Sequence, residues 1–154
     1  MKVFISYGDA ADQVTALRLQ ALGAVNGLTV YVPPAYTRQS PSAGPDSESG
    51  QQLNTADVIL GVVASGLSEA CRQELNAALA VRKPTIVMAD PQHASLFAPH
   101  FGPNLIVIDP LSPDRAELGI VQHLKGIKAA QNATKALLAL GTLALGLLIL
   151  APQD

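Results

Sequence analysis

The amino-acid sequence predicts an α/β domain in which five parallel strands are flanked by helices. Short runs of β-branched and apolar residues alternate along the chain with longer segments of helical spacing. Such alternation is typical of a parallel sheet with right-handed crossover connections. Residues 57–63, DVILGVV, are apolar without a polar residue at every second position, as expected for a strand buried on both faces. With 154 residues the chain is long enough for one such domain and a short appendage.

Each expected strand is bounded by residues that favour turns. Gly8 follows the first strand, Pro33 closes the second, and Pro84 precedes the fourth. The predicted strands are residues 3–7, 28–32, 57–63, 85–89 and 105–108. Because ligands of such sheets bind beyond the carboxyl ends of the strands, the segments that follow them are the first candidates for a site.

Helical segments separate these strands. Asp9 or Asp12 is expected to cap the first helix, and Ser65 or Ser68 the helix after the third strand. Apolar residues of helical spacing in the first helix are Val14, Leu17, Leu19, Leu22 and Val25. The predicted helical segments are residues 14–25, a turn at 51–55, 69–81, 93–97, and a last helix from near Pro113 to about residue 131.

Residues 35–50 differ in composition from the rest of the chain. Ser, Pro, Gly and Asp dominate, and no periodic pattern of apolar residues appears. The segment is therefore predicted to be a long exposed loop. Long loops in compact domains are usually functional or mobile.

The C-terminal part, residues 132–154, is expected to form a hydrophobic helix. From Ala136 to Ala151 it has no charged residue, and as a helix it would reach about 24 Å, against the ~30 Å hydrocarbon core of a bilayer. Lysines precede it, which favours the cytoplasmic side for residues 1–131. The sequence predicts a domain tethered to the inner membrane by a single span, with the C-terminus outside. The alternative is a buried or oligomer-forming apolar helix.

Charge and composition argue against several other classes of site. The formal net charge is −2 and no Lys/Arg cluster is present, so no nucleic-acid partner is expected. The single cysteine excludes an internal disulfide and a Cys-rich zinc site. His93, His100 and His123 lack the spacing of metal ligands, so no metal is expected. Neither a G-x-G-x-x-G nor a GK[ST] loop follows the first strand.

Four stretches, taken in order, resemble the Toll/interleukin-1 receptor (TIR) family of the bacterial kind. They are KVFISY at 2–7 with Asp12 close behind, LNTADVILGVVAS at 53–65, SEACRQEL at 68–75, and RKPTIVM at 82–88. The resemblance covers about residues 1 to 125. It implies a flavodoxin-like TIR domain over residues 1–131 with a five-stranded parallel sheet flanked by helices.

In NAD⁺-cleaving TIR domains the catalytic residue is a Glu on the helix that corresponds to residues 69–81, and Glu74 takes that position. A carboxylate is suited to the reaction because breaking the nicotinamide–ribose bond builds oxocarbenium character on the ribose. The alternative is a solvated glutamate on a helix surface.

The resemblance also indicates residues that would bind the substrate NAD⁺. They are Tyr7, Gly8, Asp9, Arg38, Ser65 and Ser68. Ser65 and Ser68 lie where a helix N-terminus offers N–H groups to a phosphate or hydroxyl, and simple N-capping is the alternative. Tyr7 would contact the base or ribose, and Arg38 the pyrophosphate. NAD⁺ is a substrate in this reading, and no cofactor is expected.

The resemblance implies hydrolysis of NAD⁺, or its cyclisation, to ADP-ribose products. It further implies self-association through the TIR domain and a part in bacterial anti-phage defence. Gly8 stands where many active members have a polar residue, and Ala70 where some have Trp. Two alternatives stay open: a non-catalytic TIR–TIR interaction module at the membrane, and a nucleoside deoxyribosyltransferase-like enzyme.

Overall fold

The computed structural model describes residues 1–40, 42–109 and 111–129, and these form the predicted α/β architecture. The strands are β1 (Lys2–Tyr7), β2 (Thr29–Tyr31), β3 (Val58–Val63), β4 (Thr85–Ala89) and β5 (Leu105–Val107). They form one sheet in the order β2-β1-β3-β4-β5, and every neighbouring pair is parallel. That order is the one found in flavodoxin-like sheets.

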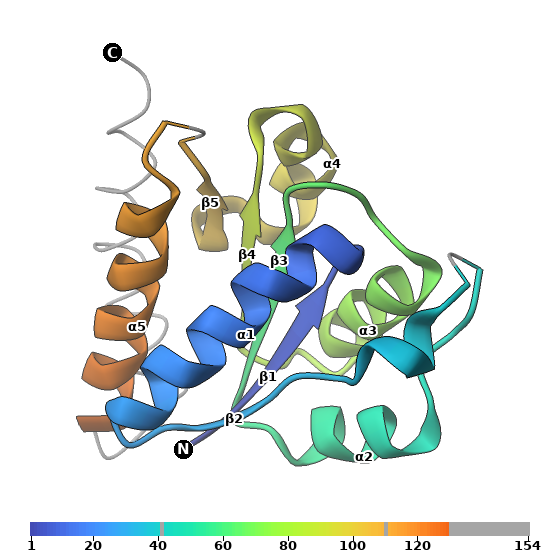
Figure 1. The fold of residues 1–154 in the computed structure, drawn as a ribbon, viewed down its shortest axis with the longest axis horizontal. Coiled ribbons are helices and arrows are strands. Elements are labelled where there is room, and N and C mark those ends of the chain that lie inside the picture. The colour runs from blue at the N-terminus through green and yellow to red at the C-terminus, as the bar shows by residue number, and fades with distance from the viewer. Residues whose placement is uncertain (41, 110, 130–154) are drawn as a thin grey trace.

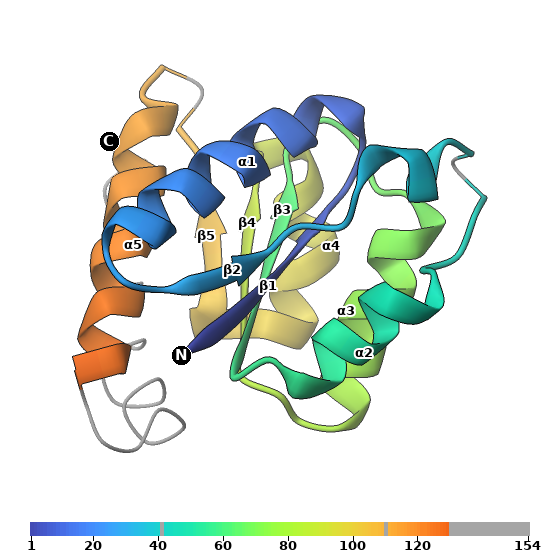
Figure 2. The same cartoon turned by 60° about the horizontal axis from the view of Figure 1, so that its bottom comes forward.

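Helices cover both faces of the sheet (Figure 1). They are α1 (Ala10–Val25), α2 (Ser47–Thr55), α3 (Glu69–Ala80), α4 (Pro91–Phe101) and α5 (Pro113–Ala129), with short 3-10 helices η1 (Ala35–Arg38) and η2 (Gly102–Asn104). α1 and α5 lie on one face, and α2, α3 and α4 lie on the other, as the turned view in Figure 2 makes plain.

The apolar core follows this division into two layers. Leu60 and Val62 of β3 point towards α1 and α5, whereas Ile59 and Val63 point towards α2, α3 and α4. All six residues of β3 are buried, which confirms the interpretation of its unbroken apolar run. Two buried layers contribute to the low share of charged residues, 14% of this sequence.

Most element boundaries agree with the sequence prediction to within one or two residues. β4 begins and ends where predicted, and Asp9 caps α1 by accepting hydrogen bonds from the N–H groups of Ala11 and Asp12. Ser68, rather than Ser65, caps α3. Asp12 is not a cap, and its carboxylate has another partner, described below.

The buried face of α1 differs from the apolar spacing in the sequence. Val14, Leu17 and Val25 are exposed, and the buried residues are Asp12, Ala16, Leu19 and Gly23. The reason is close packing: a Cβ at Gly23 would lie 2.7 Å from Cγ2 of Val30 on the segment of β2. Small side chains therefore allow α1 to approach the sheet, and the larger apolar residues are left outside.

The predicted loop at residues 35–50 is partly helical. Residues 35–38 form η1, and α2 begins at Ser47 instead of residue 51 because the Asp46 carboxylate accepts a hydrogen bond from Ser49 N at 3.2 Å. α4 is also longer than the predicted 93–97, since Asp90 caps it and Pro91 suits its first turn.

The predicted C-terminal hydrophobic helix, residues 132–154 with the candidate span from Ala136 to Ala151, lies outside the described residues. Within the described ranges no helix is both long enough and apolar enough to cross a bilayer.

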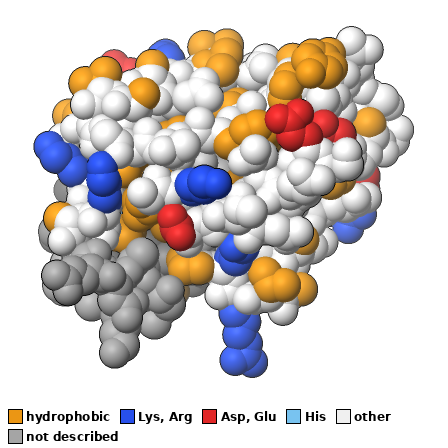
Figure 3. Space-filling model, turned by 90° about the horizontal axis from the view of Figure 1, so that it is seen from below, with side chains coloured by type: hydrophobic (Ala, Val, Ile, Leu, Met, Phe, Trp, Pro, Cys, Tyr) orange, Lys and Arg blue, Asp and Glu red, His pale blue; other side chains and the backbone are white. Residues whose placement is uncertain are grey.

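Figure 3 shows one face of the molecule, on which Lys and Arg side chains and Asp and Glu side chains are scattered among uncharged and apolar surface. Among the described residues of α1 the only exposed charge is Arg18, which pairs with Glu117 of α5. Charge is thus spread thinly over the domain.

His123 on α5 gives a test of this packing. It is 7% exposed, its Nε2 has no hydrogen-bond partner among the described residues, and burial lowers its pKa below the ordinary 6.5. The unfolded chain therefore binds a proton at His123 more readily than the folded chain does. The part of the free energy of unfolding that depends on a neutral His123 is present above pH 6.5 and is lost as pH falls below it. His123→Leu should flatten this dependence. Chemical unfolding of both proteins at about pH 7.5 and 5.5 measures it, and parallel pH profiles would contradict the burial of His123.

Candidate functional site

The candidate site lies where the strand order reverses. β1 has β2 on one side and β3 on the other, and the chain leaves the carboxyl ends of β1 and β3 towards opposite faces of the sheet. Crevices at such switch points are the usual ligand sites of open α/β sheets. Gly8 and Asp9 follow β1 there, and the segment from Ala64 to Ser68 follows β3.

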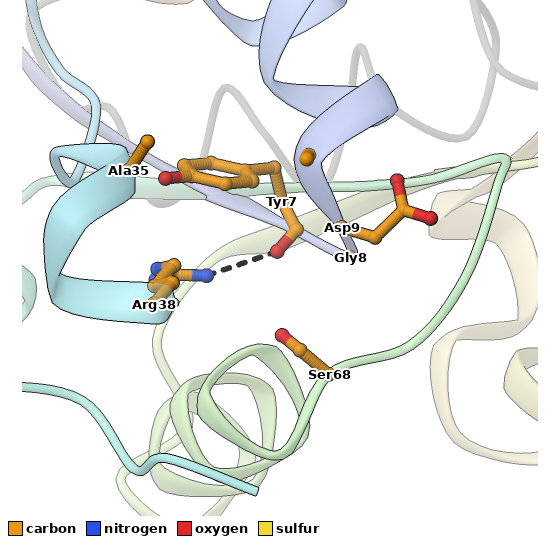
Figure 4. Close-up of a pocket in the computed structure, with 7 residues that line it drawn as sticks. Tyr7, Gly8, Asp9, Ala35, Arg38 and Ser68 are labelled. Carbon is orange, nitrogen blue, oxygen red and sulfur yellow. Dashed lines mark hydrogen bonds between the residues drawn. The ribbon is translucent and has the colours of Figure 1, made fainter. Parts of the chain in front are cut away.

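A cavity opens at this point (Figure 4). Its volume is about 40 Å³, and it is lined by Tyr7, Gly8, Asp9, Ala10, Ala35, Arg38 and Ser68. A wider groove of about 420 Å³, open to solvent, adjoins it over Gly8, Asp9, Ala10, Arg38, Gln39, Gly66, Leu67 and Ser68. Five of the seven residues predicted from sequence, namely Tyr7, Gly8, Asp9, Arg38 and Ser68, therefore line one cavity.

Arg38 forms one wall of the cavity and is held on three sides. Its Nη1 donates to the Tyr7 carbonyl at 2.9 Å, and its guanidinium carbon lies 4.4 Å from the centre of the Tyr7 ring. Its Nη2 donates to both carboxylate oxygens of Glu74. The side chain is only 5% exposed, and burial lowers the pKa of its guanidinium. Nε has no partner within the described residues.

Glu74 lies beneath Arg38, outside the lining of the cavity. It is on α3, its side chain is 1% exposed, and the Arg38 guanidinium covers its carboxylate. The alternative of a solvated surface glutamate is wrong. In this arrangement Glu74 is next to the cavity and reaches it only if Arg38 moves.

Gly8 is where the β1–α1 turn meets the loop after β3. Its N–H donates to Val62 O at 2.8 Å, and its carbonyl accepts from Ser68 N at 2.8 Å. A Cβ at Gly8 would lie 1.8 Å from the Gly66 carbonyl oxygen. The absence of a polar side chain at this position thus has a structural cause, because no side chain fits.

Asp12, in the first turn of α1, also joins the start of α1 to the loop after β3. Its carboxylate accepts hydrogen bonds from the backbone N–H groups of Ala64 and Ser65 at 3.0–3.2 Å. The residue is 2% exposed, and burial raises the pKa of its carboxyl despite these hydrogen bonds. Ser65 itself is exposed and is absent from the lining of the cavity.

The remaining side chains at this edge form hydrogen bonds with backbone groups. Asp9 and Ser68 both face the cavity while they cap α1 and α3, so capping and lining coincide at these positions. Burial raises the pKa of the Tyr7 hydroxyl, which donates to Pro33 O at 2.8 Å. That bond ties the end of β1 to the segment leading into η1.

Cys71 does not supply a nucleophile in this site. It is fully buried, and burial raises its pKa to about 11, so the thiol is protonated near neutral pH. The Ser6 hydroxyl donates to its sulfur at 3.2 Å. The described residues also contain no group of three or more His, Cys, Asp or Glu side chains placed to hold a metal ion.

Sequence reasoning missed the importance of Asp12, Gly66 and Ala35. A signal existed for Asp12, since a second Asp follows the capping Asp9 by three residues and needs a partner of its own. No local signal marks Gly66 or Ala35. Their roles depend on segments distant in sequence.

Comparisons with known proteins show similarity in fold. No family model and no curated protein matches the chain. One similar solved structure is the sugar isomerase domain of an RpiR transcription factor from Sphaerobacter thermophilus, 15% identical, covering 90% of this chain and 75% of that chain with a TM-score of 0.58. Another is a 2-deoxyribosyltransferase from Bacillus psychrosaccharolyticus, 14% identical, covering 58% of this chain and 72% of that chain with a TM-score of 0.46. Neither of these two is a TIR domain.

The buried ion pair should make Glu74 and Arg38 structural as well as functional candidates. Removing one partner leaves an uncompensated buried charge, so Glu74→Ala should lower the free energy of unfolding by about 3–5 kcal/mol. The double variant Arg38→Met/Glu74→Ala should lose much less than the two single variants, Arg38→Met and Glu74→Ala, combined. Denaturant unfolding as a double-mutant cycle measures this, and a Glu74→Ala protein as stable as the parent would contradict the pairing.

Gly8→Ala tests the close approach of the two loops. The added methyl would meet the Gly66 carbonyl, so we expect a loss of roughly 1–3 kcal/mol of stability from overpacking. Gly50→Ala is the matched control: it lies in α2, where a Cβ would meet nothing within 4 Å, and helix propensity should make it neutral or stabilising. Equal unfolding midpoints for both variants would count against the assigned role of Gly8.

Proposed function

We propose that this chain cleaves the nicotinamide–ribose bond of NAD⁺ at the β1–β3 edge, with Glu74 as the catalytic carboxylate. The observation that carries the proposal is the position of Glu74, directly behind an arginine that lines a cavity at the switch point. A buried carboxylate beside a small cavity that opens into a wider groove is suited to stabilising positive charge that develops on a ribose. The resemblance of residues 68–75 to the TIR pattern supports the same assignment.

Arg38 connects substrate binding to the exposure of Glu74. The diphosphate of NAD⁺ would sit at the cavity, near Arg38 and the N-terminal end of α3 at Ser68, where cationic and helix-dipole attraction favour an anion. When the guanidinium pairs with the diphosphate it leaves the carboxylate. Glu74 is then free to face the ribose.

The chemistry that follows is a substitution at the ribose C1′ atom. The C1′–N bond breaks, and its electron pair leaves with neutral nicotinamide while Glu74 stabilises the oxocarbenium character of the ribose. A water molecule attacks C1′ and releases its proton to solvent, giving ADP-ribose. An adenine nitrogen of the same nucleotide in place of water would give a cyclised product.

The wider proposal is a bacterial TIR protein whose activity depends on assembly. The segment from Ala136 to Ala151 would hold the domain at the inner membrane with residues 1–131 in the cytoplasm. Confinement to the bilayer plane raises the effective concentration of the domains and so favours self-association. Depletion of NAD⁺ in an infected cell would serve anti-phage defence.

One observation favours a second candidate, a non-catalytic interaction module. The Glu74 carboxylate is fully occupied by Arg38 and absent from the cavity lining, as expected for an ion pair whose role is to fix the fold. Such a module would present the surface around residues 35–50 to another domain. It would bind partners and leave NAD⁺ unchanged.

NAD⁺ turnover by the full chain, clustered on vesicles or beads, separates the two. The parent protein should release nicotinamide, and Glu74→Gln should lower the rate by roughly 10²-fold or more through loss of the charge at the reacting centre. Glu48→Gln, an exposed glutamate of α2, is the matched control and should keep full activity. Unfolding curves for each variant separate loss of chemistry from loss of fold.

Two other results would favour a different function. A folded, clustered parent that leaves NAD⁺ intact would favour the interaction module. Release of free base from 2′-deoxynucleosides, with NAD⁺ untouched, would favour a deoxyribosyltransferase-like enzyme that uses the same carboxylate.

A further inference from the structure

A second opening lies between α3 and α4, on the face of the sheet opposite α1 and α5 (Figures 1 and 2). Its volume is about 210 Å³, and it is open to solvent. It shares Leu67 with the wider groove at the switch point, and it shares no residue with the small cavity beside Arg38. We call this opening the α3–α4 groove. It is therefore separate from the proposed place of NAD⁺ chemistry.

Apolar side chains form the floor of the α3–α4 groove. Leu75 and Leu79 are one turn apart on α3, and Phe97 and Phe101 are one turn apart on α4, so each pair lies on one face of its helix. The two phenylalanine rings are tilted by 54°, with their centres 6.0 Å apart. Leu75 packs against Gly61 of β3, where a Cβ would lie 3.1 Å from its Cδ2. The floor is thus held by the packing of both helices on the sheet.

Polar groups occupy the rim of the groove. Arg72 and Asn76 of α3 and His100 of α4 line it, and all three are exposed. No Asp or Glu is among the lining residues. Glu69 accepts hydrogen bonds from Nε and Nη2 of Arg72, which leaves Nη1 without a partner among the described residues. An exposed pair of this kind contributes little free energy, so the guanidinium remains available to a second carboxylate.

We infer that the α3–α4 groove binds a small aromatic carboxylic acid, with its ring against Phe97 and Phe101 and its carboxylate at Arg72. Apolar walls with a few polar groups are the usual composition of a small-molecule site. An apolar cavity of about 150 Å³ holds benzene, so this larger space has room for one ring and a short side chain. A third ring suits the tilted pair because aromatic groups attract one another edge to face.

The negative charge of the ligand follows from the rim. A guanidinium donates two parallel hydrogen bonds to a carboxylate, and such charge-assisted bonds are about twice as strong as neutral ones. The side-chain amide of Asn76, one turn beyond Arg72, and the imidazole of His100 across the groove offer further donors. A cationic ligand would instead meet Arg72 and no lining carboxylate. Ring and charge together therefore define the ligand class.

Equilibrium dialysis of the full chain in lipid vesicles against 3-phenylpropanoate tests this assignment, with protein-free vesicles to correct for partitioning into lipid. We expect saturable binding with a Kd on the order of 1 mM or tighter, as is ordinary for a ligand of this size. The alcohol 3-phenylpropan-1-ol keeps the ring and lacks the charge, and it should bind about tenfold more weakly. Octanoate keeps the charge and lacks the ring, and it should also bind more weakly.

Four variants locate the site. Arg72→Gln should weaken binding of 3-phenylpropanoate by roughly tenfold and leave binding of the alcohol unchanged. Arg115→Gln, at an exposed arginine of α5, is the matched control and should change neither. Asn76→Trp should fill the groove from α3 and abolish binding of both compounds. Leu96→Trp, at a residue that is 57% exposed, fills it from α4 and serves if the unfolding curve of Asn76→Trp departs from that of the parent.

Three results would overturn the inference. No saturable binding by the parent, or binding that persists in a folded Trp variant, would show that the groove does not hold the ligand. Octanoate binding as tightly as 3-phenylpropanoate would show that the ring is not recognised. An equal loss of acid and alcohol binding in Arg72→Gln would show that Arg72 does not pair with the carboxylate. The readout is binding away from Glu74, so it is independent of NAD⁺ turnover.

Discussion

The candidate site is organised around one guanidinium that has been taken out of water. Removing an ion from solvent costs several kcal/mol, so a buried arginine requires an equally buried counter-charge and acceptors for its remaining N–H groups. Arg38 finds the counter-charge on Glu74 and a further acceptor in the Tyr7 carbonyl. Through these contacts η1, α3 and the end of β1 meet at one group. The shape of the cavity and the concealment of Glu74 both follow from it.

The sheet was predictable because its signals are local. β4 is bounded by Pro84 and Asp90, and β3 is an unbroken apolar run, so each strand could be read from its own residues. Asp9 and Ser68 could be named as caps for the same reason, and caps at the carboxyl edge of a parallel sheet also face its ligand crevice. Because of that coincidence, five of the seven predicted residues line one cavity.

The features that the sequence did not reveal arise from contacts between residues that are far apart in the chain. Arg38 stands in a stretch rich in turn-forming residues, and nothing near it signals a partner 36 positions away. The orientation of α1 was hidden for a related reason. Ala16 and Gly23 form the buried side because they are small, whereas a search for apolar spacing gives weight to large residues such as Leu17. Packing against a sheet here selects for small volume more than for hydrophobicity.

The two walls of the cavity are held with different strength, and this has a kinetic consequence. On one side Gly8, Ser68 and Asp12 join two loops through backbone hydrogen bonds and leave no room for adjustment. On the other side η1 has no side-chain cap and is held through Arg38 and through the hydrogen bond from the Tyr7 hydroxyl to Pro33 O. A ligand can therefore reach Glu74 only when η1 and Arg38 move. The rate of its binding would therefore approach a limit as ligand concentration rises. Its apparent affinity would be lower than the intrinsic affinity in proportion to the fraction of molecules in which Arg38 has separated from Glu74.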